Sequence, residues 1–299
     1  MRNGFLLLLI GFNVLWAGTY SVFKNLKEVL EPGELVTLRF GVAALLLGIC
    51  WPLMRGVAPK GIDLVKTLAM GVIVFVVGPR LQVFSTQMGK AGDMSVLVGL
   101  EPLVTTLGAA LLLHEKVPTR RWVGFCFGLV GAALLSNIWK PEFQLASLGA
   151  NLLFVASFFC ESAYSVMGKP LIDRYNFLKV ITVALLGGMT VNLLLDGPST
   201  WTAAHQLSAK GWLQIVYLGS LCTAVGYAVW FAAIKVVPVN VVALTLFIQP
   251  VAGAAIAAVL LGEALHLGQL WGGLTIVIGL ALGLQRAQPA KASPETTGA

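Results

Sequence analysis

Two stretches decide the fold: PLVTTLGAALLLHE at residues 102–115 and PVAGAAIAAVLLGE at residues 250–263. Both begin with proline, continue with small and branched apolar residues, and end with glutamate. The two stretches are 148 residues apart, and at this offset residues 63–135 align with residues 211–283 without a gap. Glycines coincide at four positions of the first copy: Gly71, Gly78, Gly124 and Gly131. The chain therefore contains an internal duplication.

The composition places both copies in a membrane. Of the 299 residues, 58% are hydrophobic and 11% are charged, whereas a soluble chain carries about 25% charged residues. Apolar runs near the length that crosses roughly 30 Å of hydrocarbon recur along the sequence. We predict an all-α polytopic membrane protein with ten transmembrane helices, at residues 4–23, 34–54, 65–87, 93–113, 121–138, 147–168, 177–195, 211–234, 240–261 and 268–285.

The duplication predicts two five-helix repeats of opposite orientation. Because five is an odd number, the second copy must enter the membrane from the other side, as in transporters with inverted repeats. The first repeat covers residues 1–140 and the second covers residues 141–286. Residues 287–299, rich in Ala, Pro, Ser and Thr, are predicted to form a disordered tail.

The basic residues indicate the orientation. With the N-terminus in the cytoplasm, 13 Lys and Arg fall on the cytoplasmic side and 5 on the other, which predicts cytoplasmic termini and a bacterial inner membrane. The net charge of +7 is scattered through short loops, which argues against nucleic acid as a partner. The four cysteines form no CxxC or Cys/His pair and are expected to be small buried apolar residues. We expect no cofactor and no metal.

These features resemble the drug/metabolite transporter superfamily, specifically its ten-helix EamA-type exporters. The resemblance rests on the two Pro…Glu segments and on the glycine-rich fifth and tenth helices, and it covers residues 4–285. It implies a central cavity, alternating access, and export of amino acids or similar small metabolites. Among its branches, the chain resembles the aromatic and neutral amino-acid exporters. Many relatives have an aromatic residue before the proline of helix 4, where this chain has Glu101.

Charged residues inside predicted spans are candidates for the substrate cavity, because each costs roughly 2.5–3.5 kcal/mol to insert. Arg80 and Glu101 lie at similar depth, so they form either a structural ion pair or an alternately exposed charge that holds substrate. Glu161 lies deeper and is a candidate for lining the cavity and for proton coupling. Arg39 is expected to extend to the outer membrane surface. The full predicted cavity set is Gly78, Arg80, Gln82, Glu101, Ser157, Glu161, Tyr164, Tyr227, Trp230 and Gln249.

Proline and glycine inside helices are candidates for kinks, which are either static or hinges for gating. This set comprises Gly78, Pro79, Pro102, Gly226 and Pro250. Pro102 and Pro250 are symmetry mates, which favours hinges. Glu101 and Gln249 precede these prolines and differ from each other, as recognition of an asymmetric substrate requires.

The predicted function is export of small amphipathic metabolites, most of all aromatic or neutral amino acids, across the lipid bilayer. Two alternatives share the fold: transport of nucleosides, drugs or phosphorylated sugars, and a channel. An enzyme is not expected, because the sequence has no GxSxG, no HExxH and no paired intramembrane aspartates. The oligomeric state stays open, and a monomer is compatible with the pattern.

Overall fold

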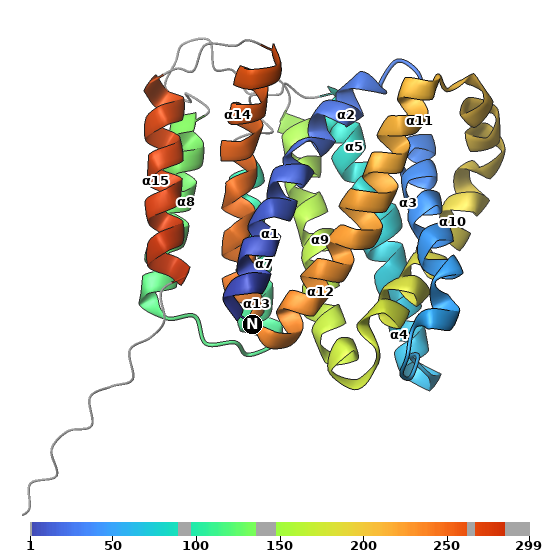
Figure 1. Ribbon diagram of the computed structural model, residues 1–299, viewed down its shortest axis with the longest axis horizontal. Coiled ribbons are helices and arrows are strands. Elements are labelled where there is room, and N and C mark those ends of the chain that lie inside the picture. Colours follow the sequence, from blue (N-terminus) through green and yellow to red (C-terminus); the bar gives the residue numbers. More distant parts are fainter. Residues whose placement is uncertain (1, 89–96, 136–147, 262–266, 285–299) are drawn as a thin grey trace, which may run out of the picture.

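A computed structural model describes residues 2–88, 97–135, 148–261 and 267–284, and every regular element in these ranges is helical. Six helical runs are long and apolar enough to cross a membrane, and three shorter helices are also apolar. The helices stand side by side across one slab (Figure 1), and many large apolar side chains on its surface are exposed. The chain is an all-α, multi-pass membrane protein, as predicted.

Ten helical spans occur within the described residues, five in each repeat. In the first repeat, span 1 comprises α1 (Arg2–Ala17) and α2 (Thr19–Asn25), span 2 is α3 (Pro32–Ile49) followed by the turn η1 (Trp51–Leu53), span 3 comprises α4 (Gly61–Val72), η2 (Ile73–Val77) and α5 (Gly78–Met88), span 4 comprises η3 (Val98–Leu100) and α7 (Glu101–Leu112), and span 5 is α8 (Thr119–Leu135).

The second repeat follows the same order. Span 6 is α9 (Leu148–Arg174), span 7 is α10 (Phe177–Gln206), span 8 comprises α11 (Ala209–Val216), η4 (Tyr217–Val225) and α12 (Gly226–Val236), span 9 comprises α13 (Val239–Ala243), η5 (Leu244–Phe247) and α14 (Ile248–Leu261), and span 10 is α15 (Leu267–Leu284). The predicted tail at 287–299 lies outside the described residues.

The predicted helix positions are confirmed, but some of the ends are wrong. Span 7 was expected to stop near residue 195, at the Asp-Gly-Pro sequence, yet α10 continues through Pro198 to Gln206. A proline removes one backbone donor and clashes with the preceding turn, but neighbouring groups can compensate for this in a membrane helix. Span 2 begins at Pro32, two residues before the predicted residue 34, because Pro32 occupies its first turn and Glu31 and Glu34 form a capping box.

Spans 3 and 8 are irregular at equivalent positions. The π-helical segments η2 and η4 end directly before Gly78 and Gly226, which are symmetry mates. Pro79 has no N–H for the carbonyl of Phe75, and Asn192 of span 7 donates to that carbonyl instead, at 3.0 Å. Single π turns inside α-helices are rare and often mark functional sites.

Spans 4 and 9 are also irregular at equivalent positions. Each contains a 3-10 segment, η3 or η5, just before the proline of its repeat, Pro102 or Pro250. A 3-10 stretch within a longer helix often marks a hinge or a strained sequence. Four of the ten spans thus change helix type at symmetry-related points in the middle of the molecule.

Contacts between spans 5 and 10 demonstrate the two-fold relation. A Cβ on Gly124 would lie 2.8 Å from the carbonyl oxygen of Gly279, and a Cβ on Gly131 would lie 2.7 Å from that of Gly272. Gly272 is the symmetry mate of Gly124, and Gly279 is the symmetry mate of Gly131. Replacing each glycine by its mate therefore converts one contact into the other, as a two-fold axis requires. Glycine at all four positions lets the two backbones approach closely (α8 and α15 in Figure 1).

The two repeats are interleaved rather than placed beside one another. Span 1 packs on spans 8 and 9 of the second repeat, and its mate, span 6, packs on spans 3 and 4 of the first. Gly71 of span 3 packs against the backbone of Ala184 in span 7, and its mate, Gly219 of span 8, packs against the backbone of Arg39 in span 2. Each repeat therefore supplies walls for the other.

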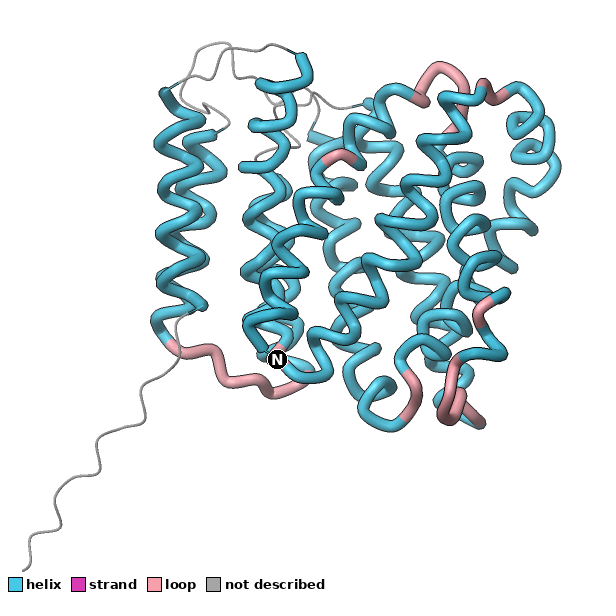
Figure 2. Tube along the Cα trace, in the orientation of Figure 1, coloured by secondary structure: helices cyan, strands magenta, loops and turns pink. Residues whose placement is uncertain are grey.

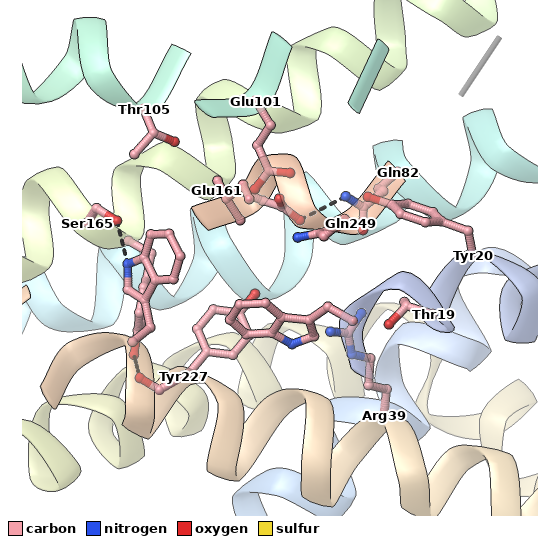
Figure 3. Close-up of a pocket in the computed structure, with 14 residues that line it drawn as sticks. Thr19, Tyr20, Arg39, Gln82, Glu101, Thr105, Glu161, Ser165, Tyr227 and Gln249 are labelled. Atoms are coloured by element: carbon pink, nitrogen blue, oxygen red, sulfur yellow. Dashed lines mark hydrogen bonds between the residues drawn. The ribbon is translucent and has the colours of Figure 1, made fainter. Parts of the chain in front are cut away.

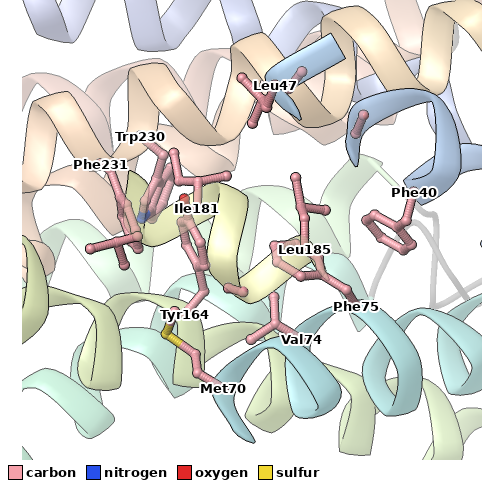
Figure 4. Close-up of a cluster of buried hydrophobic side chains, with 14 of the residues drawn as sticks. Phe40, Leu47, Met70, Val74, Phe75, Tyr164, Ile181, Leu185, Trp230 and Phe231 are labelled. Atoms are coloured by element: carbon pink, nitrogen blue, oxygen red, sulfur yellow. The ribbon is translucent and has the colours of Figure 1, made fainter. Parts of the chain in front are cut away.

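The apolar core draws on both repeats as well. Phe40 and Phe75 of the first repeat have ring centroids 5.0 Å apart. Tyr164 and Phe231 of the second repeat stack with centroids 3.9 Å apart, and Phe75 also contacts Tyr164 (Figure 4). Aromatic contacts of this kind contribute about 0.5–1.5 kcal/mol beyond the area they bury.

Several loops lie at the end of the molecule where the N-terminus is found (Figure 2). Side-chain hydrogen bonds at this end join the first repeat to the second. The Glu115 carboxylate accepts hydrogen bonds from the backbone N–H groups of Val239 and Asn240, at 2.8 and 3.0 Å, and so caps the start of span 9. At the start of span 3, Asp63 accepts hydrogen bonds from Arg174 and from the Tyr175 hydroxyl, at 3.2 and 3.1 Å.

Candidate functional site

A polar cavity of about 80 Å³ lies where the two repeats meet (Figure 3). It has room for about five to eight water molecules at the roughly 10–15 Å³ that each requires. Its walls come from spans 1, 2, 3, 4, 6, 8 and 9. The lining residues are Trp16, Thr19, Tyr20, Arg39, Gln82, Glu101, Thr105, Glu161, Tyr164, Ser165, Tyr227, Trp230, Leu246 and Gln249.

Symmetry mates line this cavity in pairs. At the 148-residue offset Glu101 corresponds to Gln249 and Gln82 to Trp230, and all four line the cavity. Tyr20 and Tyr164 form a third pair, because the sequence Tyr-Ser-Val occurs at residues 20–22 of span 1 and again at residues 164–166 of span 6. The cavity therefore lies on the pseudo-two-fold axis, and its walls differ chemically because two of the three pairs combine different side chains.

Two carboxyl groups meet on one wall. Glu101 at the start of α7 and Glu161 in the middle of α9 both line the cavity, and Figure 3 shows their carboxyl groups on the same side of it. Gln82 donates a further hydrogen bond from Nε2 to Glu161 Oε1 at 2.9 Å. Glu101 and Gln82 are buried, with exposed fractions of 8% and 5%. Among the described residues, no Lys or Arg forms an ion pair with either glutamate.

Aromatic side chains form another wall, and hydrogen bonds from other spans hold them in place. Trp230 donates to Ser165 Oγ at 2.8 Å, and the Tyr164 hydroxyl donates to the carbonyl of Tyr227 at 3.1 Å. Trp16 donates to the carbonyl of Cys222, inside the π segment η4, at 2.6 Å. The rings are thus fixed before any ligand arrives, which lowers the entropy lost on binding.

Gln249 is positioned by a polar chain that reaches span 1. Its Nε2 donates to Asn13 Oδ1 at 3.0 Å, and Asn13 Nδ2 donates in turn to Thr245 Oγ1 at 3.1 Å. Asn13 and Thr245 are fully buried. The amide of Gln249 therefore faces the cavity in a defined orientation.

Arg39 overturns one sequence prediction. It does not extend to the membrane surface but is buried, with 5% of its surface exposed, and it lines the cavity. Its Nε donates to Thr223 Oγ1 of span 8 at 3.0 Å. The depth estimated along the helix was a poor guide, because it ignores which side of the helix faces protein.

Arg80 overturns a second sequence prediction. Its predicted partner was Glu101, but its Nη2 bonds instead to Asp196 Oδ2 at 2.5 Å and to Asn192 Oδ1 at 2.6 Å, both in span 7. Arg80 does not line the cavity. Asp196 had been assigned to a loop, so no partner in span 7 was considered.

Two further predicted cavity residues lie next to the cavity rather than on its wall. Gly78 packs against span 6, where an added Cβ would lie 2.8 Å from that of Cys160. Ser157 is buried and donates to the carbonyl of Phe154 at 2.6 Å. The other seven predicted residues line the cavity: Gln82, Glu101, Glu161, Tyr164, Tyr227, Trp230 and Gln249.

The cavity also contains seven residues outside the predicted set. Tyr20 was recognisable as the repeat mate of Tyr164, and Trp16 lies one helical turn before Tyr20 on the same face. Thr105 and Ser165 lie one helical turn after Glu101 and Glu161 on the same faces, so their spacing also marked them, whereas Thr19 and Leu246 carried no comparable signal. Arg39 had the signal of a charged residue within a span, but that signal was assigned to the surface.

Metal and thiol chemistry receive no support from the described ranges. No group of three or more His, Cys, Asp or Glu that could hold a metal occurs in them. The expectation that all four cysteines are buried holds for Cys222 alone, since Cys50 and Cys126 are exposed and Cys160 is half-buried.

The EamA-like transporter family matches residues 3–137 and, a second time, residues 148–284. The chain belongs to this family. The double match coincides with the two five-helix repeats of the structure. EamA-like proteins belong to the drug/metabolite transporter superfamily, so the resemblance inferred from the Pro…Glu segments is confirmed.

Similar proteins carry several transport names. The chain is 27% identical to the uncharacterized transporter YdfC of Bacillus subtilis, over 89% of this chain and 86% of that protein. It is 25% identical to a probable amino-acid metabolite efflux pump of Salmonella typhimurium, over 93% of both chains. A riboflavin transporter of Vibrio cholerae is 30% identical over 61% of this chain and 58% of its own.

A solved crystal structure has the same fold, with a TM-score of 0.76 over 94% of this chain and 96% of the other, at 20% sequence identity. This likeness supports the ten-span architecture as a whole. The chain is accordingly a membrane transporter of the EamA-like family.

Proposed function

We propose that this EamA-like transporter exports small amphipathic metabolites, above all amino acids with aromatic or neutral side chains. The cavity between the repeats carries the proposal, because it combines a carboxyl pair, a guanidinium and an aromatic wall within one small volume. Ligand sites are mostly apolar with a few placed polar groups, and an amino acid presents the complementary surface. The relative named as an amino-acid metabolite efflux pump, similar over 93% of the chain, agrees with this assignment.

Alternating access is the proposed mechanism. Inverted repeats allow two conformations of similar energy, with the cavity open to opposite faces of the membrane. The helix-type changes at Gly78 and Gly226, and before Pro102 and Pro250, supply symmetric points at which spans 3, 4, 8 and 9 can bend. These residues are the proposed hinges, and the cavity residues form the proposed substrate site.

We place the protein in the inner membrane with both termini in the cytoplasm. The loops around Arg55, Lys60, Arg121 and Arg174 lie at one end of the molecule, where the first and second repeats contact each other. Loops rich in Lys and Arg stay in the cytoplasm during insertion. The cavity is complete within one chain, so a monomer suffices for transport.

The test is flux through the purified protein in liposomes. Efflux of a panel of labelled amino acids, including phenylalanine, tryptophan, leucine and threonine, is measured against protein-free liposomes. Saturable efflux of at least one aromatic or neutral amino acid is the expected result. Flux equal to that of empty liposomes across the whole panel would contradict the proposal.

Variants of the carboxyl pair test the site. Glu101→Gln and Glu161→Gln each remove a carboxyl group while keeping the shape of the side chain. We expect roughly 10- to 100-fold slower transport, because this is the effect of losing one charge-assisted hydrogen bond to the substrate. Glu28→Gln is the control, because Glu28 is exposed in the loop between spans 1 and 2. Repeating the assay with and without a pH gradient shows whether a proton moves together with the substrate. Full activity in both cavity variants would remove the pair from the site.

A second candidate is transport of a flavin, a nucleoside, a drug or a phosphorylated sugar. It draws on the relative named as a riboflavin transporter and on the aromatic wall, which can stack a planar ring. Thermal stabilisation of the purified protein by riboflavin, uridine or glucose 6-phosphate, but by no amino acid, would favour it. Phosphate recognition would favour several cations, and Arg39 is the one Lys or Arg among the lining residues.

A further inference from the structure

Arg39 is held rigidly in the wall of the cavity. Its Nε bonds to Thr223 of the other repeat, at 3.0 Å. Its guanidinium carbon lies 5.1 Å from the ring centroid of Phe40 and 5.8 Å from that of Phe23, within the range of cation–π attraction. One hydrogen bond and two aromatic rings thus fix the planar guanidinium. The N–H groups on its two terminal nitrogens, Nη1 and Nη2, stay available.

These remaining donors have no partner among the residues that the structure describes. Arg39 forms no ion pair there, and its only hydrogen bond uses Nε, although the side chain is 5% exposed and lines the cavity. A buried charge is normally paired or fully hydrogen-bonded. Arg80 shows the usual arrangement, since Asp196 and Asn192 both bind its guanidinium.

The opposite wall has the opposite chemistry. Figure 3 shows Glu101, Glu161, Gln82 and Gln249 gathered on one side and Arg39 with Thr19 on the other. Arg39 and Glu161 both line the cavity, yet no ion pair joins them. A ligand that bridges the walls must be an acceptor at one end and a donor at the other.

We propose that Arg39 is the anchor for a carboxylate group of the substrate, with Glu101 and Glu161 facing the ammonium group. The free terminal nitrogens of a guanidinium match the two oxygens of a carboxylate in parallel, which a lysine cannot reproduce. This inference rests on the proposed function and deepens it: the substrate is recognised as a zwitterion, and the aromatic wall takes the side chain.

The experiment measures binding, so it also applies to variants that do not transport. Thermal unfolding of detergent-purified protein is followed with increasing L-phenylalanine, L-phenylalanine methyl ester, which lacks the carboxylate, and 3-phenylpropanoate, which lacks the ammonium group. L-leucine and its methyl ester form a second pair. The wild-type protein should bind each amino acid at least tenfold more tightly than its ester, and phenylalanine at least tenfold more tightly than phenylpropanoate.

Variants assign the preference to Arg39. In Arg39→Gln the amino acid and its ester should bind equally weakly, whereas Arg39→Lys should retain part of the preference. Arg80→Gln is the matched control, because that guanidinium lies outside the cavity, and the preference should persist there. If Arg39→Gln does not fold, the wild-type comparison and Arg39→Lys still decide the question.

Two failures can be distinguished. Equal binding of amino acid and ester by the wild-type protein, or an undiminished preference in folded Arg39→Gln, would overturn the role of Arg39 and leave amino-acid export standing. Binding and transport of no amino acid at all would overturn the proposed function, and this inference with it.

Discussion

The Arg80–Asp196 pair should stabilise the contact between spans 3 and 7. The two side chains are 21% and 26% exposed and approach to 2.5 Å, so screening by water is partial. In a double-mutant cycle with Arg80→Gln and Asp196→Asn, we expect a coupling energy of about 1–2 kcal/mol in thermal unfolding of the purified protein.

A second pair of the same type provides the control. Lys169 and Asp173 approach to 2.6 Å within one helix, but the carboxylate is 47% exposed. Pairs of this kind contribute about 0.3–0.5 kcal/mol. Equal couplings for the two pairs would show that Arg80 and Asp196 do not hold the spans together.

Helical elements were predictable in number and position, but not in their internal form. Hydropathy and loop residues located all ten spans, because crossing the bilayer requires a minimum length of apolar helix. The π and 3-10 segments were not predicted, although prolines and glycines marked their neighbourhood. These segments depend on side chains from other spans, such as Asn192 donating to the carbonyl of Phe75.

Close packing of elements depends on glycine at a few positions. A Cβ on Gly71 would lie 1.9 Å from the backbone oxygen of Ala184, so Gly71→Ala must push spans 3 and 7 apart. We expect a loss of about 2–3 kcal/mol in stability, typical of overpacking, measured by thermal unfolding.

Gly11→Ala is the matched control for this substitution. Gly11 lies inside α1 with nothing within 4 Å of an added Cβ. Alanine there should be neutral or stabilising by up to about 1 kcal/mol, because it favours the helix. A destabilisation by Gly11→Ala as large as that by Gly71→Ala would contradict the packing argument.

The architecture of the whole molecule followed from the repeat, with one exception. The alignment at 148 residues predicted two inverted five-helix units and pointed to Glu101 and Gln249 as equivalent cavity positions. It did not predict that the units interleave, since a repeat in one sequence contains no information about which spans of different copies touch. Trp16 and Arg39 were missed for this reason: both face the other repeat.

The orientation of the whole molecule is open to a direct test. Lys60 lies in the loop before span 3 and Lys27 in the loop after span 1, both exposed and at opposite ends of the helices. In a cysteine-free background, Lys27→Cys should react with a membrane-impermeant maleimide on intact spheroplasts. Lys60→Cys should react only after permeabilisation, and the reversed pattern would invert the topology.

The measurement that tests the central claim most directly is counterflow. Liposomes containing the purified protein are loaded with unlabelled amino acid, chosen as the fastest compound of the efflux panel, and diluted into a trace of the labelled compound. If a single site opens alternately to each face, the labelled compound accumulates transiently inside the liposomes above its outside concentration. This transient accumulation should be absent in Glu161→Gln. Equilibration without any overshoot, with or without internal substrate, would contradict alternating access and identify a channel.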